Sequence, residues 1–121
     1  MIDKLTIAVE RSDDMARFYA AVLGFHMIMH ELHGVRLHVG TKSGFELMLV
    51  PRSVANVIAR DNHLQVRFIV ADVAAAVASA LSSGGTVLGD IETLGGRRFA
   101  LLRDPDGNVL EMAEPVARRT S

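Results

Sequence analysis

The chain contains no cysteine and no tryptophan. The lack of cysteine excludes disulfide bonds, iron–sulfur clusters and cysteine-ligated zinc, and it fits a cytoplasmic protein. No apolar run approaches the ~20 residues that cross a bilayer, and the first ten residues alternate instead of forming the apolar block of a signal peptide. The net charge is −1 with both signs interspersed, so no basic stripe indicates nucleic-acid binding. We therefore expect a cytoplasmic protein that binds neither nucleic acid nor membranes.

What the chain does contain is enough apolar sequence for one core. Half of its 121 residues are hydrophobic, and a chain of this length fits one domain. It can therefore fold without a structural metal. We expect a single domain over residues 1–121.

Alternation and helical spacing divide the chain into two similar halves. In the first half, Leu5, Ile7 and Val9 share one face of a strand, and a helix follows from the expected N-cap Ser12 to Gly24. In the second half, a strand is followed by a helix with Asp72 as its expected N-cap. The predicted strands are residues 2–10, 26–32, 35–41, 45–50, 63–70, 86–91, 97–103 and 109–113.

The two halves are copies of one unit. Laying Val9 on Val70 also lays Gly24 on Gly85. Self-similarity at a fixed offset indicates a repeated supersecondary motif. The sequence therefore predicts an α+β fold of two tandem βαβββ modules, the first over about 1–51 and the second over about 63–114, with helices on the outer face of a sheet. Residues 52–62 join the modules and are expected to include a short helical turn.

Three short motifs carry a resemblance to a known family. Phe18-Tyr19 and residues 22–25 (VLGF) lie on and just after the first helix, and residues 104–108 (DPDGN) form a tight turn before the last strand. Together they resemble the glyoxalase/bleomycin resistance/extradiol dioxygenase superfamily, also called the vicinal oxygen chelate superfamily, over residues 2–114. The resemblance implies curled, mixed or antiparallel sheet that encloses a cavity, and a homodimer. Its metal-dependent members hold a divalent ion with side chains from the first and last strand of each module.

Those ligand positions fall on Lys4, Glu46, Gln65 and Glu111. A lysine ammonium donates hydrogen bonds and is a poor metal ligand. We therefore expect Lys4 to stand where the family holds its metal and to pair with the two carboxylates, with no cofactor bound. The disfavoured alternative is a divalent ion held by Glu46, Gln65 and Glu111, whose oxygen atoms suit a hard cation.

Further cavity residues are predicted from strand parity. If His33-Gly34 is a two-residue hairpin loop, Met29 lies opposite His38. We assign His38 to the cavity face together with Met48 and Arg67, whereas Val39 and its alternate neighbours are assigned to the core. Core packing for the methionines and a surface role for His38 stay open as alternatives. The predicted binding cavity is Lys4, Glu46, Met48, Gln65, Arg67, Glu111 and His38.

Three functions follow from this set. The favoured one is a metal-independent small-molecule-binding protein similar to the bleomycin-resistance members of the superfamily. The alternative is a glyoxalase-, epimerase- or lyase-type enzyme of the same superfamily that uses a divalent metal at Glu46, Gln65 and Glu111. The third is an interaction module with a vestigial cavity. Membership of a fold does not choose among them.

Overall fold

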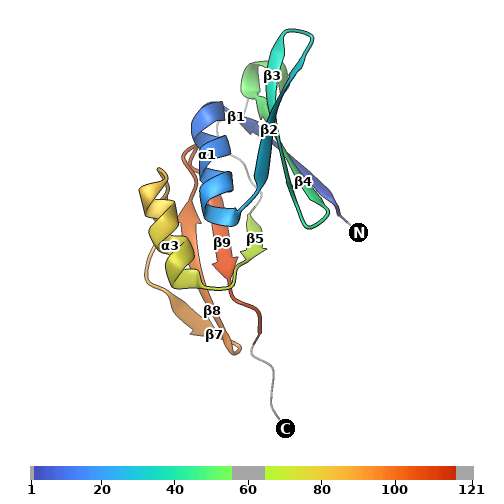
Figure 1. Ribbon diagram of the computed structural model, residues 1–121. Helices are drawn as coiled ribbons and strands as arrows, with labels where there is room; N and C mark the ends of the chain where they lie inside the picture. The colour runs from blue at the N-terminus through green and yellow to red at the C-terminus, as the bar shows by residue number, and fades with distance from the viewer. Residues whose placement is uncertain (1, 56–64, 117–121) are drawn as a thin grey trace.

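The computed structural model describes residues 2–55 and 65–116 and confirms two βαβββ-like modules in an α+β fold (Figure 1). The first module consists of β1 (Lys4–Val9), α1 (Ser12–Leu23), β2 (His26–Leu32), β3 (Val35–Lys42) and β4 (Phe45–Pro51). A short helix, α2 (Arg52–Ala55), follows it. The second module consists of β5 (Val66–Ile69), α3 (Val73–Ser82), β6 (Thr86–Val87), β7 (Glu92–Leu94), β8 (Arg97–Arg103) and β9 (Val109–Ala113).

Local sequence explains most element boundaries. The Asp72 side chain caps α3 by accepting from the Ala75 N–H, as predicted, and Gly24 ends α1 in the left-handed conformation with φ 73°. Ser12 is not the cap of α1: the helix begins at Ser12, and Arg11 precedes it without a side-chain cap bond. The helical turn expected in residues 52–62 is α2, and residues 56–62 of that segment lie outside the described residues.

Only the first two residues of the strand expected over 86–91 form a strand, and a separate short strand follows that range. β6 ends at Val87, and β7 begins only at Glu92, although both pair with β8. Gly89 lies between them at φ 145°, a backbone conformation that a regular strand does not use. The glycine therefore interrupts the ladder.

Each module forms its own mixed sheet. The strand orders are β1-β4-β3-β2 and β5-β9-β8-β6, with β7 also on β8, and the first and last strands of each module run parallel. The expected curl is wrong: the sheets are open and twisted (Figure 1). Curvature is usually introduced by bulges, whereas β2 and β3 pair without a break from His26↔Thr41 to Leu32↔Val35.

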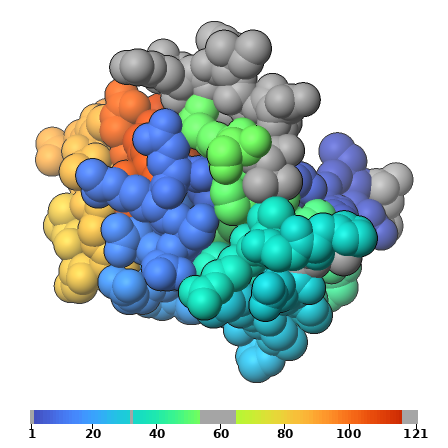
Figure 2. Space-filling view, turned by 90° about the horizontal axis from the view of Figure 1, so that it is seen from above, coloured from blue at the N-terminus to red at the C-terminus, as the bar shows by residue number. Residues whose placement is uncertain are grey.

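The helices cover one face of the sheets and join the modules. Figure 2 shows β2 and β3 on one side of α1 and the second module on the other. One buried cluster draws on both halves: Met15, Phe18 and Tyr19 of α1 pack in the same core as β4 and the second sheet. Its members from the sheets are Val9, Leu47, Leu49, Leu102, Leu110 and Met112. The two modules therefore share a core on the helix side.

The turn at residues 104–108 fastens one module to the other. The buried Tyr19 hydroxyl donates to Asp104 Oδ2 at 2.9 Å. The Asp106 carboxylate accepts from the backbone N–H groups of Glu10 and Arg11 at 2.8 and 3.1 Å. Asp104 also accepts from Asn108, whose side-chain nitrogen lies at 2.8 Å. The motif is thus a structural link between the halves of the chain.

Candidate functional site

The face of each sheet that the helices leave uncovered, here called the open face, carries the predicted ligand positions. In the first sheet, Leu47 and Leu49 point into the core, so Glu46 and Met48 point to the open face. In the second sheet, Leu110 and Met112 are buried, so Glu111 points to the open face. This parity agrees with the sequence prediction for the last strand of each module.

On the first open face, Lys4 and Glu46 form an ion pair. The two residues are register partners on the parallel strands β1 and β4, and Lys4 Nζ lies 3.4 Å from Glu46 Oε2. Their side chains are 43% and 40% exposed. Met48 follows Glu46 on the same face and is half-buried beside Val39 of β3. Lys4 therefore neutralises the carboxylate that a metal would need.

On the second open face, the partner of Glu111 is Arg67, so the expected pairing of Lys4 with both carboxylates holds for Glu46 and is wrong for Glu111. Arg67 and Glu111 are register partners on β5 and β9, and Arg67 Nε donates to Glu111 Oε2. Gln65, which the sequence analysis placed at the ligand position of this module, is exposed and lies two residues before Arg67. The side chain of Glu111 is only 16% exposed, whereas that of Arg67 is 54% exposed. The arginine thus covers the carboxylate.

The two modules therefore repeat one arrangement: a cation on the first strand and a carboxylate on the last. The Lys4–Glu46 pair, whose side chains are 43% and 40% exposed, contributes about 1 kcal/mol or less to folding. The chemical consequence of the two pairs is larger, because a divalent cation approaching either carboxylate meets a positive charge within a few ångströms. Within residues 2–55 and 65–116, no three His, Cys, Asp or Glu side chains are grouped as a metal site requires.

His38 does not share a face with the other predicted site residues. It lies opposite Leu49 on the helix-covered side of the first sheet and is 8% exposed. Its Nε2 atom is 3.3 Å from Asp13 Oδ1 in the first turn of α1. His38 lines a separate pocket of about 560 Å³ at the start of α1. Arg17 and Arg36 also line this pocket.

His38 was misplaced because the apolar alternation of Val35, Leu37 and Val39 was taken to mark the core face of β3. The predicted pairing of Met29 with His38 is confirmed, but the two-residue turn Ser43-Gly44 sets His38 opposite the buried Leu49. Both turn residues have positive φ, 50° and 81°, as a tight hairpin turn requires. A slip of one residue transfers every side chain of a strand to the opposite face. Val39 consequently lies on the open face, and β2 follows the same inversion.

Sequence reasoning also missed two polar groups on the helix side. Asp13, the partner of His38, lies in the acidic first turn of α1, where only the corrected strand parity would have suggested the contact. Lys42 lies just beyond the predicted strand 35–41, and its ammonium donates to the carbonyl oxygen of Leu23 at the end of α1. The signal that would have found both is the Ser43-Gly44 pair, which fixes the parity of β3.

The described part of the chain includes no helix long and apolar enough to cross a membrane.

Comparison of the structure with solved structures gives matches over nearly its whole length. A glyoxalase-related enzyme from Fulvimarina pelagi has 18% identity and a TM-score of 0.80, with 95% of this chain and 88% of that chain covered. A glyoxalase/bleomycin resistance protein/dioxygenase family enzyme from Burkholderia phytofirmans has 19% identity and a TM-score of 0.78, with 95% and 98% covered.

A lactoylglutathione lyase from Agrobacterium tumefaciens has 20% identity and a TM-score of 0.69, with 94% of this chain and 92% of that chain covered. At these identities the structures establish the shared fold and nothing about the reaction. No curated protein sequence matches the chain. The model of the Glyoxalase/Bleomycin resistance protein/Dioxygenase superfamily matches residues 1–112. The chain, with its two βαβββ modules and paired open faces, therefore belongs to the Glyoxalase/Bleomycin resistance protein/Dioxygenase superfamily.

Proposed function

We propose that the protein is a metal-independent small-molecule-binding protein of this superfamily. The observation that carries the proposal is the repeated ion pair: Lys4 with Glu46, and Arg67 with Glu111. A carboxylate already paired with a cation has lost much of its attraction for a divalent ion. The same pairs leave polar hydrogen-bonding groups on the open faces, which suit an organic ligand.

The surroundings of the pairs support an organic ligand. On the first face, Met48 and Val39 offer a half-buried apolar surface beside Lys4. Binding sites for small molecules are mostly apolar with a few placed polar groups, and methionine adapts to irregular ligands.

We further propose that the complete site forms between two copies of the chain. Open, uncurled sheets leave Lys4 and Arg67 on separate faces, and β1 and β5 are edge strands of their sheets. Free strand edges carry unpaired backbone groups that proteins commonly cover. A two-fold dimer would set the first open face of one copy against the second open face of the other. The proposed site then comprises Lys4, Glu46, Met48, Gln65, Arg67 and Glu111.

The test compares metal binding by the native protein and by a variant that lacks the first cation. The melting temperature of the native protein should be unchanged by a chelator, and added zinc or nickel should bind weakly. The variant Lys4→His removes one charge and adds a ligand beside Glu46, so its affinity for these ions should rise. Arg103→His also replaces an exposed strand cation by histidine, but its register partners Thr86 and Val109 supply no carboxylate, so it should bind metal no better than the native protein.

Two results would contradict the proposal. The first is native protein purified with a stoichiometric metal whose removal lowers the melting temperature. The second is equal metal affinity in the native protein and in Lys4→His, because Lys4 would then have no influence on the carboxylate. The first result would favour the enzyme alternative with a divalent ion at Glu46, Gln65 and Glu111.

A further inference from the structure

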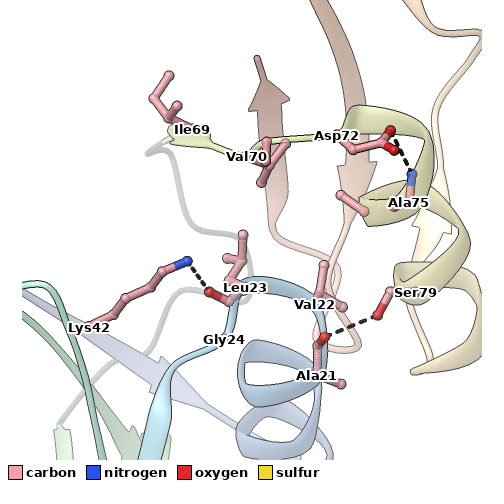
Figure 3. Close-up of a pocket in the computed structure, with 12 residues that line it drawn as sticks. Ala21, Val22, Leu23, Gly24, Lys42, Ile69, Val70, Asp72, Ala75 and Ser79 are labelled. Carbon is pink, nitrogen blue, oxygen red and sulfur yellow. Dashed lines mark hydrogen bonds between the residues drawn. The ribbon is translucent and has the colours of Figure 1, made fainter. Parts of the chain in front are cut away.

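A groove separate from the open faces lies where the two modules meet on their helix side (Figure 3). Its volume is about 490 Å³, within the range of small-molecule sites. One wall is the last turn of α1, and the opposite wall is the first half of α3 with the chain that leads into it from β5. The residues that line it are 21–24, 42, 69–72, 75, 76 and 79.

The groove exists because its walls carry small side chains. Ala21 on α1 faces Ala75 and Ala76 on α3, and the Ser79 hydroxyl bridges the helices by donating to the Ala21 carbonyl oxygen at 3.2 Å. Val22 and Val70 add half-buried apolar surface. The lining is therefore mostly aliphatic, with a polar bridge at one end.

The other end of the groove carries a lysine with no carboxylate partner in the described part of the chain. Figure 3 shows the Lys42 side chain extended toward α1, where its ammonium donates to the Leu23 carbonyl oxygen. An ammonium has three N–H donors, so this contact positions the charge and leaves donors for a ligand. No Asp or Glu of residues 2–55 and 65–116 lies within ion-pair distance of it.

The single negative charge in the lining is already engaged. Asp72 accepts from the Ala75 N–H at 3.2 Å as the cap of α3, and its carboxylate also lies 3.7 Å from Arg98. The uncompensated charge of the groove is therefore positive and is located on Lys42.

We propose that this inter-module groove is a second ligand site, which takes a small aliphatic monocarboxylate. The carboxylate would pair with Lys42, and the aliphatic tail would lie along Ala21, Val22 and Ala75. A groove with one cation on an aliphatic surface suits a ligand that has one negative charge and an apolar tail. A phosphate dianion would find no second cation in the lining. Lys42 lies on the helix-covered side of β3, so this site and the open-face site take their ligands independently.

The test is a titration of the ¹⁵N-labelled native protein, followed by amide chemical shifts, with octanoate kept below its micellar concentration. Octanol and octylammonium serve as probes with the same tail and no negative charge. We expect saturable shifts at residues 21–24 and 69–76 with octanoate, and affinity for both other probes weaker by roughly tenfold, the usual loss for a missing charged hydrogen bond. Octanol binding as tightly as octanoate, or shifts that never saturate in this groove, would overturn the proposal.

Substitutions test the contributions of Lys42 and of the aliphatic wall to binding separately. Lys42→Met should weaken octanoate by roughly tenfold and leave octanol unchanged, while Arg36→Met on the same strand should alter neither. Ala75→Leu should fill the groove and abolish binding of both probes. Ala78→Leu is the matched control, since Ala78 is exposed on α3 outside the groove, and it should bind normally. Octanoate binding that is indifferent to both Lys42→Met and Ala75→Leu would disprove the site.

Discussion

The buried hydrogen bond from Tyr19 to Asp104 gives the sharpest test of how the modules are held together. Tyr19→Phe removes the hydroxyl and keeps the ring, which packs at 5.3 Å from Phe18 and 6.1 Å from Phe68 between ring centroids. Both partners of the lost bond are buried, so Asp104 is left with one acceptor site unsatisfied. The expected loss in the free energy of unfolding is about 2 kcal/mol. For a chain of this length that lowers the melting temperature by roughly 6–12 °C.

The loss should also depend on pH. Burial raises the pKa of Asp104, and hydrogen bonds from Asn108 and Tyr19 oppose that rise. A carboxyl whose pKa is higher in the folded protein binds its proton more tightly when folded, so stability falls as pH rises from the unfolded toward the folded pKa. Removing the hydroxyl raises the folded pKa further and widens that window. The deficit of Tyr19→Phe should therefore be larger at about pH 8 than at about pH 4.

Urea unfolding followed by circular dichroism measures both effects. Ser79→Ala is the control, because it removes a hydroxyl bond between α3 and α1 that is exposed to water, and it should cost about 0.5 kcal/mol or less. Equal losses for the two variants, or a Tyr19→Phe deficit that does not grow with pH, would refute this account of the link between the modules.

Three other predictions concern the proposed site and the second module. Sedimentation equilibrium at micromolar concentration should give a dimer, and a monomer would contradict a site shared between two copies. In a thermal-shift screen of antibiotics, planar aromatics and 2-oxo acids, a ligand at a hundredfold excess over its Kd should stabilise the protein by about 2.7 kcal/mol. Arg67→Ala should weaken binding of these ligands, and Arg36→Ala should not. Ligands that bind the native protein and Arg67→Ala equally well would have to bind outside the proposed site. Asp72→Ala should lower stability by about 1 kcal/mol in urea through loss of the α3 cap, whereas Asp90→Ala in an exposed segment should change little.

Most of the fold was predictable because its signals are local. Alternation located the strands, the Asp72 cap and Gly24 marked helix ends, and the internal repeat gave the two modules. The early end of β6 and the separate strand β7 were missed; Gly89, at an unusual φ, lies between them. The expected curl was wrong because it was carried over from the family resemblance, and curvature depends on bulges that the alternation pattern does not reveal.

The candidate site was predicted in part, and the errors have one form. Parity within a strand is reliable when a buried residue such as Leu47 fixes the core side, so Glu46 and Glu111 were assigned to the open faces correctly. The assignment of His38 failed because the apolar residues Val35, Leu37 and Val39 were taken to face the core, whereas the register with β4 places His38 on that side. The pairing of β2 with β3 was right.

The second module shows that strand register predicts which residue contacts the last-strand carboxylate better than position in the repeat does. Lys4 corresponds to Gln65 when Val9 is laid on Val70, yet Glu111 faces Arg67 and not Gln65. The two sheets therefore differ in the register of their first strand against their last. As a result, Lys4 and Arg67, which are not equivalent in the repeat, each pair with the last-strand carboxylate of their sheet. A pair as exposed as Lys4–Glu46 adds little to stability. The metal-independent binding site proposed above would use the cation of each pair.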